Sequence, residues 1–156
     1  MAEAQSWESP LAWNEERPDT LVICCSDGRW RRHIEQFVSD CLGGEQHADI
    51  LAVPGGVEPL TLFDLLPKDF SFLRRRVEGL VGAHGTTRIV TIAHQDCAWY
   101  KLHTIGPIRF DLRQRQLSDL KRAAARLRQM FPEVAVETWF ARLEPGPQPR
   151  IVFEVA

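Results

Sequence analysis

The chain contains the stretch LVICCSDGR at residues 21–29, and this stretch is the strongest indication of the fold. Residues 21–25 are all apolar, which is typical of a strand buried inside a sheet. Residues 26–28 are Ser, Asp and Gly, which favour a turn at the end of that strand. The stretch therefore predicts a buried strand that delivers polar side chains to one edge of a sheet.

Similar elements follow along the chain. Apolar runs at 49–53 and 88–93 predict two more strands, and alternating residues at 134–143 and 150–155 predict an antiparallel hairpin. Helical spacing of apolar residues predicts helices over 30–42, 60–66, 69–83 and 110–131. Strands that alternate with helices predict an α/β fold with three layers: a mainly parallel sheet, helices on both of its faces, and a C-terminal antiparallel hairpin.

The composition is that of an ordinary globular protein. The 156 residues are 44% hydrophobic and 26% charged, and a chain of this length buries about 70% of its unfolded surface without disulfide bonds. Residues 1–18 are polar and lack a periodic pattern. We therefore predict an N-terminal arm over residues 1–18 and a single α/β domain over residues 19–156.

Charge and hydropathy narrow the choice of partners and location. The formal net charge is −2, so we expect no nucleic acid as a partner, and we interpret the arginines at 74–76 and 122–128 as solvated helix faces. No apolar run is long enough to span a membrane, and the N-terminal residues lack the pattern of a signal peptide. We expect a cytoplasmic protein whose cysteines stay reduced.

Two short motifs stand at the ends of predicted strands. Cys25, Asp27 and Arg29 follow the first strand, and His94 and Cys97 follow the third. Ligands of open α/β sheets bind outside the carboxyl ends of the strands, so both motifs should reach the same edge. Two thiolates and an imidazole suit zinc and leave a fourth position open. We predict a zinc site formed by Cys25, His94 and Cys97.

Each of these residues also has a simpler interpretation. Cys25 alone could be a buried core thiol, and His94 could be a core histidine with satisfied hydrogen bonds. The presence of both motifs favours metal binding over those alternatives. We predict that Cys24, on the opposite side of the strand, and Cys41, on the apolar side of a helix, belong to the core.

The same motifs resemble those of the β-class carbonic anhydrases. The similarity lies in Cys25-x-Asp27-x-Arg29 and His94-x-x-Cys97, and in Gly55 and Gly56 at the place of the family's glycine loop. It extends over roughly residues 20–156.

The resemblance implies a function and a set of roles. Cys25, His94 and Cys97 would bind Zn²⁺, Asp27 and Arg29 would form the catalytic pair beside the metal, and Gly55 with Gly56 would form a loop near the substrate. The implied reaction is the reversible hydration of carbon dioxide to bicarbonate by a zinc-bound hydroxide, a carbonate dehydratase activity. The resemblance also implies a homodimer or a higher homo-oligomer.

The chain departs from the family beside the second motif. Ala93 and Ala98 stand where the family usually has glycine, and the bulky Trp99 and Tyr100 follow. Two alternatives therefore stay open. One is a zinc-binding protein of the same fold without catalysis, and the other is a hydrolase of carbon disulfide or carbonyl sulfide.

Overall fold

The structure is a computed structural model of the chain and describes residues 6–42, 48–62, 64–102 and 111–156. Its centre is a sheet in the order β2-β1-β3-β4-β5. The strands are β1 (Thr20–Cys25), β2 (Asp49–Val53), β3 (Arg88–His94), β4 (Ala135–Glu144) and β5 (Arg150–Val155). The first four pair in parallel, and β5 pairs antiparallel to β4. The predicted mainly parallel sheet with a C-terminal hairpin is confirmed.

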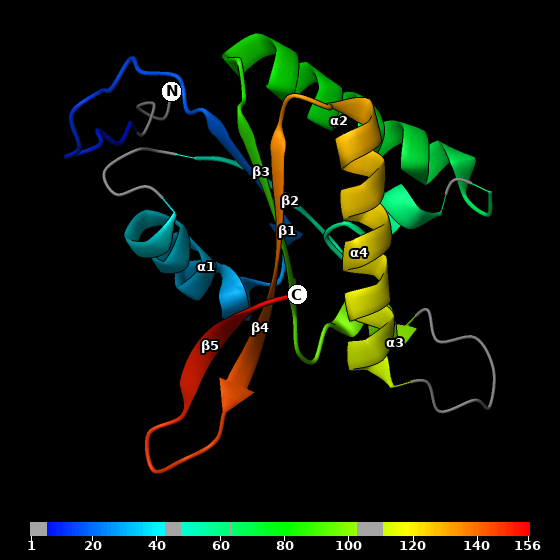
Figure 1. Ribbon diagram of the computed structural model, residues 1–156. Coiled ribbons are helices and arrows are strands. Elements are labelled where there is room, and N and C mark those ends of the chain that lie inside the picture. The colour runs from blue at the N-terminus through cyan, green and yellow to red at the C-terminus, as the bar shows by residue number, and fades with distance from the viewer. Residues whose placement is uncertain (1–5, 43–47, 63, 103–110) are drawn as a thin grey trace, which may run out of the picture.

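Helices cover both faces of this sheet, as predicted (Figure 1). Helix α1 (Gly28–Cys41) lies on one face, where Ile34 and Phe37 pack against Val22, Val90 and other strand residues. Helices α2 (Pro67–His84) and α4 (Leu112–Met130) lie on the opposite face. The three layers arise because successive residues of β1 point to opposite faces and each face buries an apolar set.

The face covered by α2 and α4 holds the larger core. Side chains of α2 and α4 pack there with the 3₁₀ helix η1 (Glu58–Thr61) and with residues of β1, β3 and β4. The fully buried members of this core include Leu21, Leu60, Leu73, Ile89 and Leu120. The short helix α3 (Ala98–Leu102) follows β3 at the edge of the sheet where β1 and β3 end.

Local sequence determines where these helices begin and end. Asp27 accepts a hydrogen bond from the Arg29 backbone N–H and so caps α1. Asp111 caps α4 in the same way. Helix α2 ends at His84, and Gly85 caps it with a φ of 66°, the left-handed conformation that glycine adopts most easily.

Two predictions of local structure are wrong. Of the described residues in the predicted helix over 60–66, only 60 and 61 are helical, in η1. Pro59 near the start of η1 and Pro67 at the start of α2 flank this segment. Pro67 disfavours a helical conformation at residue 66, and the segment between the prolines is too short to propagate an α-helix. Cys41 is exposed rather than buried, because α1 ends there and the adjacent Leu42 packs into the core instead. The predicted helix over 110–131 is confirmed as α4, although position 110 lies outside the described residues.

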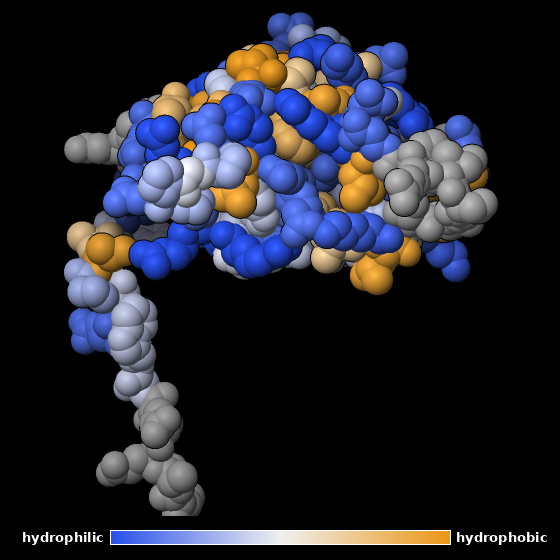
Figure 2. Space-filling view, turned by 90° about the horizontal axis from the view of Figure 1, so that it is seen from below, coloured by the Kyte–Doolittle hydropathy of each residue, from blue (hydrophilic) through white to orange (hydrophobic). Residues whose placement is uncertain are grey.

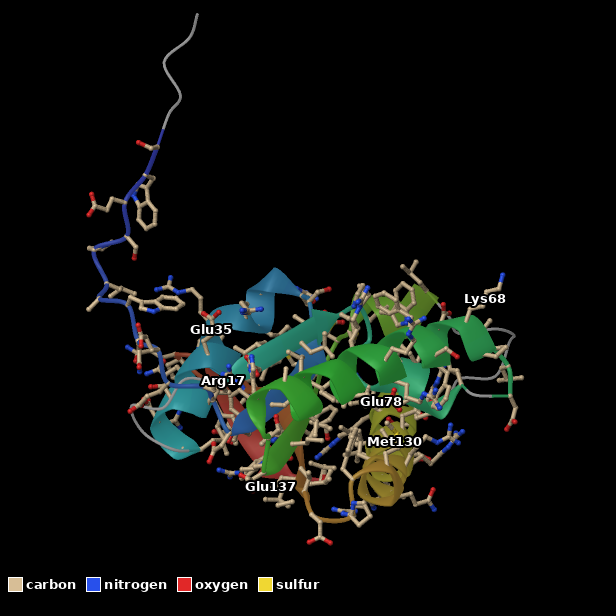
Figure 3. All side chains as sticks on the ribbon, turned by 90° about the horizontal axis from the view of Figure 1, so that it is seen from above. Arg17, Glu35, Lys68, Glu78, Met130 and Glu137 are labelled. Atoms are coloured by element: carbon tan, nitrogen blue, oxygen red, sulfur yellow. The ribbon has the colours of Figure 1, made fainter. Side chains whose placement is uncertain are left out.

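The predicted N-terminal arm lies apart from the sheet as far as it is described. Residues 6–18 form no helix or strand, and Figures 2 and 3 show this segment projecting from the rest of the molecule. Arg17 attaches its base to the end of α2 by donating to the Ala83 carbonyl at 3.1 Å. The division at residue 18 stays a prediction, and residues 1–5 lie outside the described chain.

No helix within the described ranges is both long and apolar enough to cross a bilayer.

A core substitution should reveal how much α4 contributes to stability. Leu120 is fully buried between α4 and the sheet, so Leu120→Ala should lower the free energy of unfolding by about 2–5 kcal/mol, measured by urea denaturation. Leu65→Ala is the matched control, because Leu65 is 78% exposed and its truncation should change stability by less than about 0.5 kcal/mol. Equal effects of both substitutions would contradict this packing.

Candidate metal centre

The structure brings the three predicted metal ligands together at one edge of the sheet. Strands β1 and β3 are parallel neighbours, and they end at Cys25 and His94, with Cys97 three residues further on. The ligand atoms of these residues lie within 4.8 Å of one another. The Sγ atoms of Cys25 and Cys97 are 3.8 Å apart. All three side chains are buried, so this is a compact and desolvated donor set.

His94 presents one ring nitrogen to this cluster. Its Nδ1 lies 2.8 Å from the carbonyl oxygen of Gln95, and because a carbonyl can only accept, Nδ1 carries the proton. The other nitrogen, Nε2, is buried and has no hydrogen-bond partner among the described residues. Trp30 packs on the ring, with centroids 4.8 Å apart, and Gln116 donates to the His94 carbonyl at 2.8 Å. The imidazole is therefore held with a free lone pair.

These residues fit a zinc ion. An unpartnered buried imidazole nitrogen is costly unless something accepts its lone pair. Two sulfurs that each lie about 2.3 Å from a tetrahedral zinc are separated by about 3.8 Å, which is the separation of Cys25 and Cys97. Thiolate, imidazole and thiolate are also the ligand types that zinc prefers. The cluster thus has the chemistry and the spacing of a three-ligand zinc site.

Without a bound cation, the sulfurs of Cys25 and Cys97 do not carry equal charge. The pKa of Cys25 lies below that of an ordinary thiol, chiefly because Cys97 donates to its sulfur. The pKa of Cys97 is raised by its hydrogen bond to Cys25 and by burial. Two thiolates side by side repel each other, so the pair keeps one proton unless a cation balances both charges.

Asp27 and Arg29 form a close ion pair beside the cluster. The Nε and Nη2 atoms of Arg29 donate to Asp27 Oδ1 at 3.1 Å and Oδ2 at 2.7 Å. These bonds lower the pKa of the Asp27 carboxyl to about 2, so it is ionised at neutral pH. The Asp27 side chain is 16% exposed. An oriented carboxylate thus stands two residues from Cys25.

A second carboxylate binds the other side of Arg29. Arg29 Nη1 donates to Asp96 Oδ2 at 3.2 Å, and Nη2 donates to the Asp96 carbonyl at 3.2 Å. Lys101 also pairs with Asp96. Asp96 has a φ of 62°, a left-handed conformation that aspartate tolerates better than most residues. Arg29 therefore connects the two motifs, a contact that the sequence analysis did not predict.

The two predicted loop glycines pack against the site. Gly55 and Gly56 have φ values of 76° and 60°, which favour glycine at both positions. A Cβ on Gly56 would lie 3.3 Å from the backbone of Cys24 and Cys25, so glycine lets this turn approach the end of β1. Gly55 lies beneath the Trp99 ring. Their contact with substrate stays a prediction.

Other residues near the site were not predicted from the sequence. Trp99 donates through Nε1 to Glu58 Oε2 at 2.8 Å, and Tyr100 donates to Asp119 Oδ2 at 3.0 Å. These bonds tie α3 to η1 and α4 directly after Cys97. The large aromatic residues that follow Ala98 indicate that α3 packs against another element of the fold, but the sequence does not identify Glu58 or Asp119 as the partners.

Comparison with known proteins identifies the family. Residues 15–145 match the protein family described as "Putative carbonic anhydrase". The chain belongs to this family. No curated protein sequence matches it.

Solved structures show the same fold as this carbonic anhydrase family member. β-Carbonic anhydrase isoform I from the protozoan Trichomonas vaginalis is 12% identical, with a TM-score of 0.53, and the match covers 94% of this chain and 88% of that one. The β-carbonic anhydrase CcaA is 15% identical, with a TM-score of 0.50, and the match covers 82% of this chain and 76% of that one. At these identities the comparison shows the fold alone.

Zinc should bind once per chain and stabilise the fold. A ligand present at about 1,000 times its dissociation constant adds about 4 kcal/mol of stability, so zinc should raise the melting temperature of the metal-free protein. Cys97→Ser removes one ligand and should abolish both the bound zinc, measured by atomic emission, and the thermal shift. Cys41→Ser alters an exposed thiol and should change neither. Equal zinc content in wild type and Cys97→Ser would contradict the site.

Proposed function

We propose that this chain catalyses the reversible hydration of carbon dioxide to bicarbonate, with zinc bound by Cys25, His94 and Cys97. The observation that carries the proposal is a buried three-ligand cluster with the Asp27–Arg29 ion pair at the same edge of the sheet. Membership in a family described as carbonic anhydrase supports the reaction type.

Each residue of the cluster would have a defined role. Cys25 and Cys97 would contribute thiolates, and His94 would bind through Nε2 because Nδ1 donates to Gln95. When bound, zinc supplies Lewis acidity, which makes water acidic enough to act as a nucleophile near neutral pH. Because the site offers three protein ligands, one position stays open for water or substrate.

Asp27 would orient the attacking water. Its carboxylate is ionised and can accept a hydrogen bond from that water, which directs the oxygen lone pair towards the carbon of carbon dioxide. Arg29 binds Asp27 through both Nε and Nη2, which fixes the carboxylate plane and keeps it from becoming a fourth metal ligand. Asp96 holds Arg29 from its other side. Addition of water to carbon dioxide yields bicarbonate and one proton, which passes to solvent.

Loss of Arg29 should separate metal binding from catalysis. The zinc-loaded wild type should hydrate carbon dioxide in a stopped-flow assay with a pH indicator. Arg29→Ala should lower kcat/KM by about 10²-fold while one zinc per chain is retained. Arg31→Ala is the matched control, because Arg31 pairs with Glu35 on the exposed side of α1, and it should keep wild-type activity. Full activity of Arg29→Ala would remove the ion pair from the mechanism.

The same assay distinguishes the two alternative functions. A wild-type protein that carries one zinc and shows no hydration would favour a non-catalytic zinc-binding protein of this fold. Faster turnover of carbonyl sulfide or carbon disulfide than of carbon dioxide would favour the hydrolase. Both outcomes would leave the metal site in place and contradict the proposed reaction.

We also propose a homo-oligomer in the cytoplasm. Trp7, Leu11 and Trp13 on the N-terminal arm are 82%, 82% and 86% exposed, and a second copy of the chain could cover them. Sedimentation velocity should therefore give a mass above that of one chain, and a monomer at micromolar concentration would contradict the assembly.

The four free cysteines support the proposed location in the cytoplasm, which is a reducing compartment.

A further inference from the structure

Trp99 lies two residues after Cys97 and is held by a buried carboxylate. Its Nε1 donates to Glu58 Oε2 at 2.8 Å, and Glu58 is only 3% exposed. Arg115 approaches the other oxygen of Glu58 at 3.5 Å. A buried carboxylate is costly unless it has such partners. The pairing therefore fixes the orientation of the Trp99 indole rather than leaving it free to rotate.

The indole also packs directly on the glycine turn. A Cβ on Gly55 would lie 2.4 Å from Trp99 Cδ1 and 2.9 Å from Nε1, so this arrangement requires glycine at position 55. The adjacent Gly56 approaches the backbone of Cys24 and Cys25, where an added Cβ would lie 3.3 Å away. Trp99 therefore covers the turn that packs against a predicted zinc ligand.

Trp99 contacts two neighbouring regions of the molecule. It packs against the cluster of Cys25, Cys97 and Tyr100. It also lines a cavity of about 260 Å³ between η1 and the first half of α2, the end of α2 that Lys68 marks in Figure 3. The other described residues that line this cavity are Val53, Pro54, Glu58, Pro59, Leu66, Asp69, Phe72 and Leu73. Of these lining residues, Trp99 packs its side chain against the cysteine cluster, and Val53 is the neighbour of Cys25 in the β1–β2 pairing.

We propose that Trp99 is a specificity-determining residue, a wall that separates the metal centre from the apolar cavity and limits the site to substrates as small as carbon dioxide. The proposal rests on the proposed function for the identity of the natural substrate. The wall itself rests on the contacts of Trp99 alone. Without the indole, the cavity and the metal centre become one space with an apolar lining, and that space can accept an aromatic or branched substituent.

Two small molecules that bind zinc can test the role of Trp99 without a catalytic assay. Acetohydroxamate and benzohydroxamate bind zinc through the same group and differ only in a methyl or a phenyl substituent. We would measure both affinities by calorimetry on zinc-loaded wild type, Trp99→Ala, Trp99→Leu and Phe72→Ala. Phe72 lines the cavity away from the cysteine cluster and is the matched control, because its truncation enlarges the cavity without opening it to the metal centre.

The expected result is a change in selectivity. Trp99→Ala should bind benzohydroxamate about tenfold more tightly than wild type does, and acetohydroxamate should change by less than about threefold. Trp99→Leu should show a smaller gain, and Phe72→Ala should leave the ratio of the two affinities unchanged. Added indole should compete with benzohydroxamate for Trp99→Ala, because it refills the space, and should not compete with acetohydroxamate.

Two outcomes would overturn the proposal. One is an unchanged affinity ratio in Trp99→Ala or Trp99→Leu protein that retains one zinc. The other is loss of zinc from both variants, which would make Trp99 an anchor of α3 rather than a wall. Carbon dioxide hydration by wild type is measured separately. If wild type does not hydrate carbon dioxide but Trp99→Ala changes the ratio of the two hydroxamate affinities, the proposed function is refuted and the role of Trp99 stands. If wild type hydrates carbon dioxide but the affinity ratio does not change, only the role of Trp99 is refuted.

Discussion

Two sulfur atoms and one imidazole nitrogen are held together inside the protein, away from water, and the rest of the structure around the site depends on this arrangement. The Cys25 and Cys97 sulfurs are 3.8 Å apart, and His94 Nε2 has no partner among the described residues. Burying such a donor set costs free energy unless a cation binds to it. The parallel pairing of β1 and β3 provides the proximity, because two adjacent strands end there at the same edge.

Charged and aromatic groups fix this cluster from two sides. On one side, Arg29 links Asp27 of the first motif to Asp96 of the second. Exposed ion pairs of this kind contribute little to stability, so the effect of this bridge lies mainly in orientation. On the other side, the buried Glu58 holds Trp99 over the glycine turn. The Arg29 side of the cluster is charged and exposed, whereas the Trp99 side is aromatic and partly buried.

Much of the fold was predictable because its signals are local. The apolar runs, the helical spacing and the turn residues of the C-terminal hairpin predicted the three layers and most elements. The errors occurred where local signals compete. The segment 60–66 has helical spacing, but the prolines at 59 and 67 flank it and leave it too short for an α-helix. Cys41 follows the apolar spacing of α1, but it is the last residue of that helix and Leu42 takes the buried place.

The sequence by itself determined which residues could bind zinc, because the identity of a donor atom and its position at the end of a strand are local properties. It also placed Asp27 and Arg29 two residues apart, directly after the first strand. Only the tertiary structure decided that Asp96 shares Arg29, that Glu58 holds Trp99, and that Trp99 requires glycine at position 55. These contacts join segments far apart in the chain, and their partners are selected by the packing of η1 and α3 around the sheet edge, for which no local pattern exists.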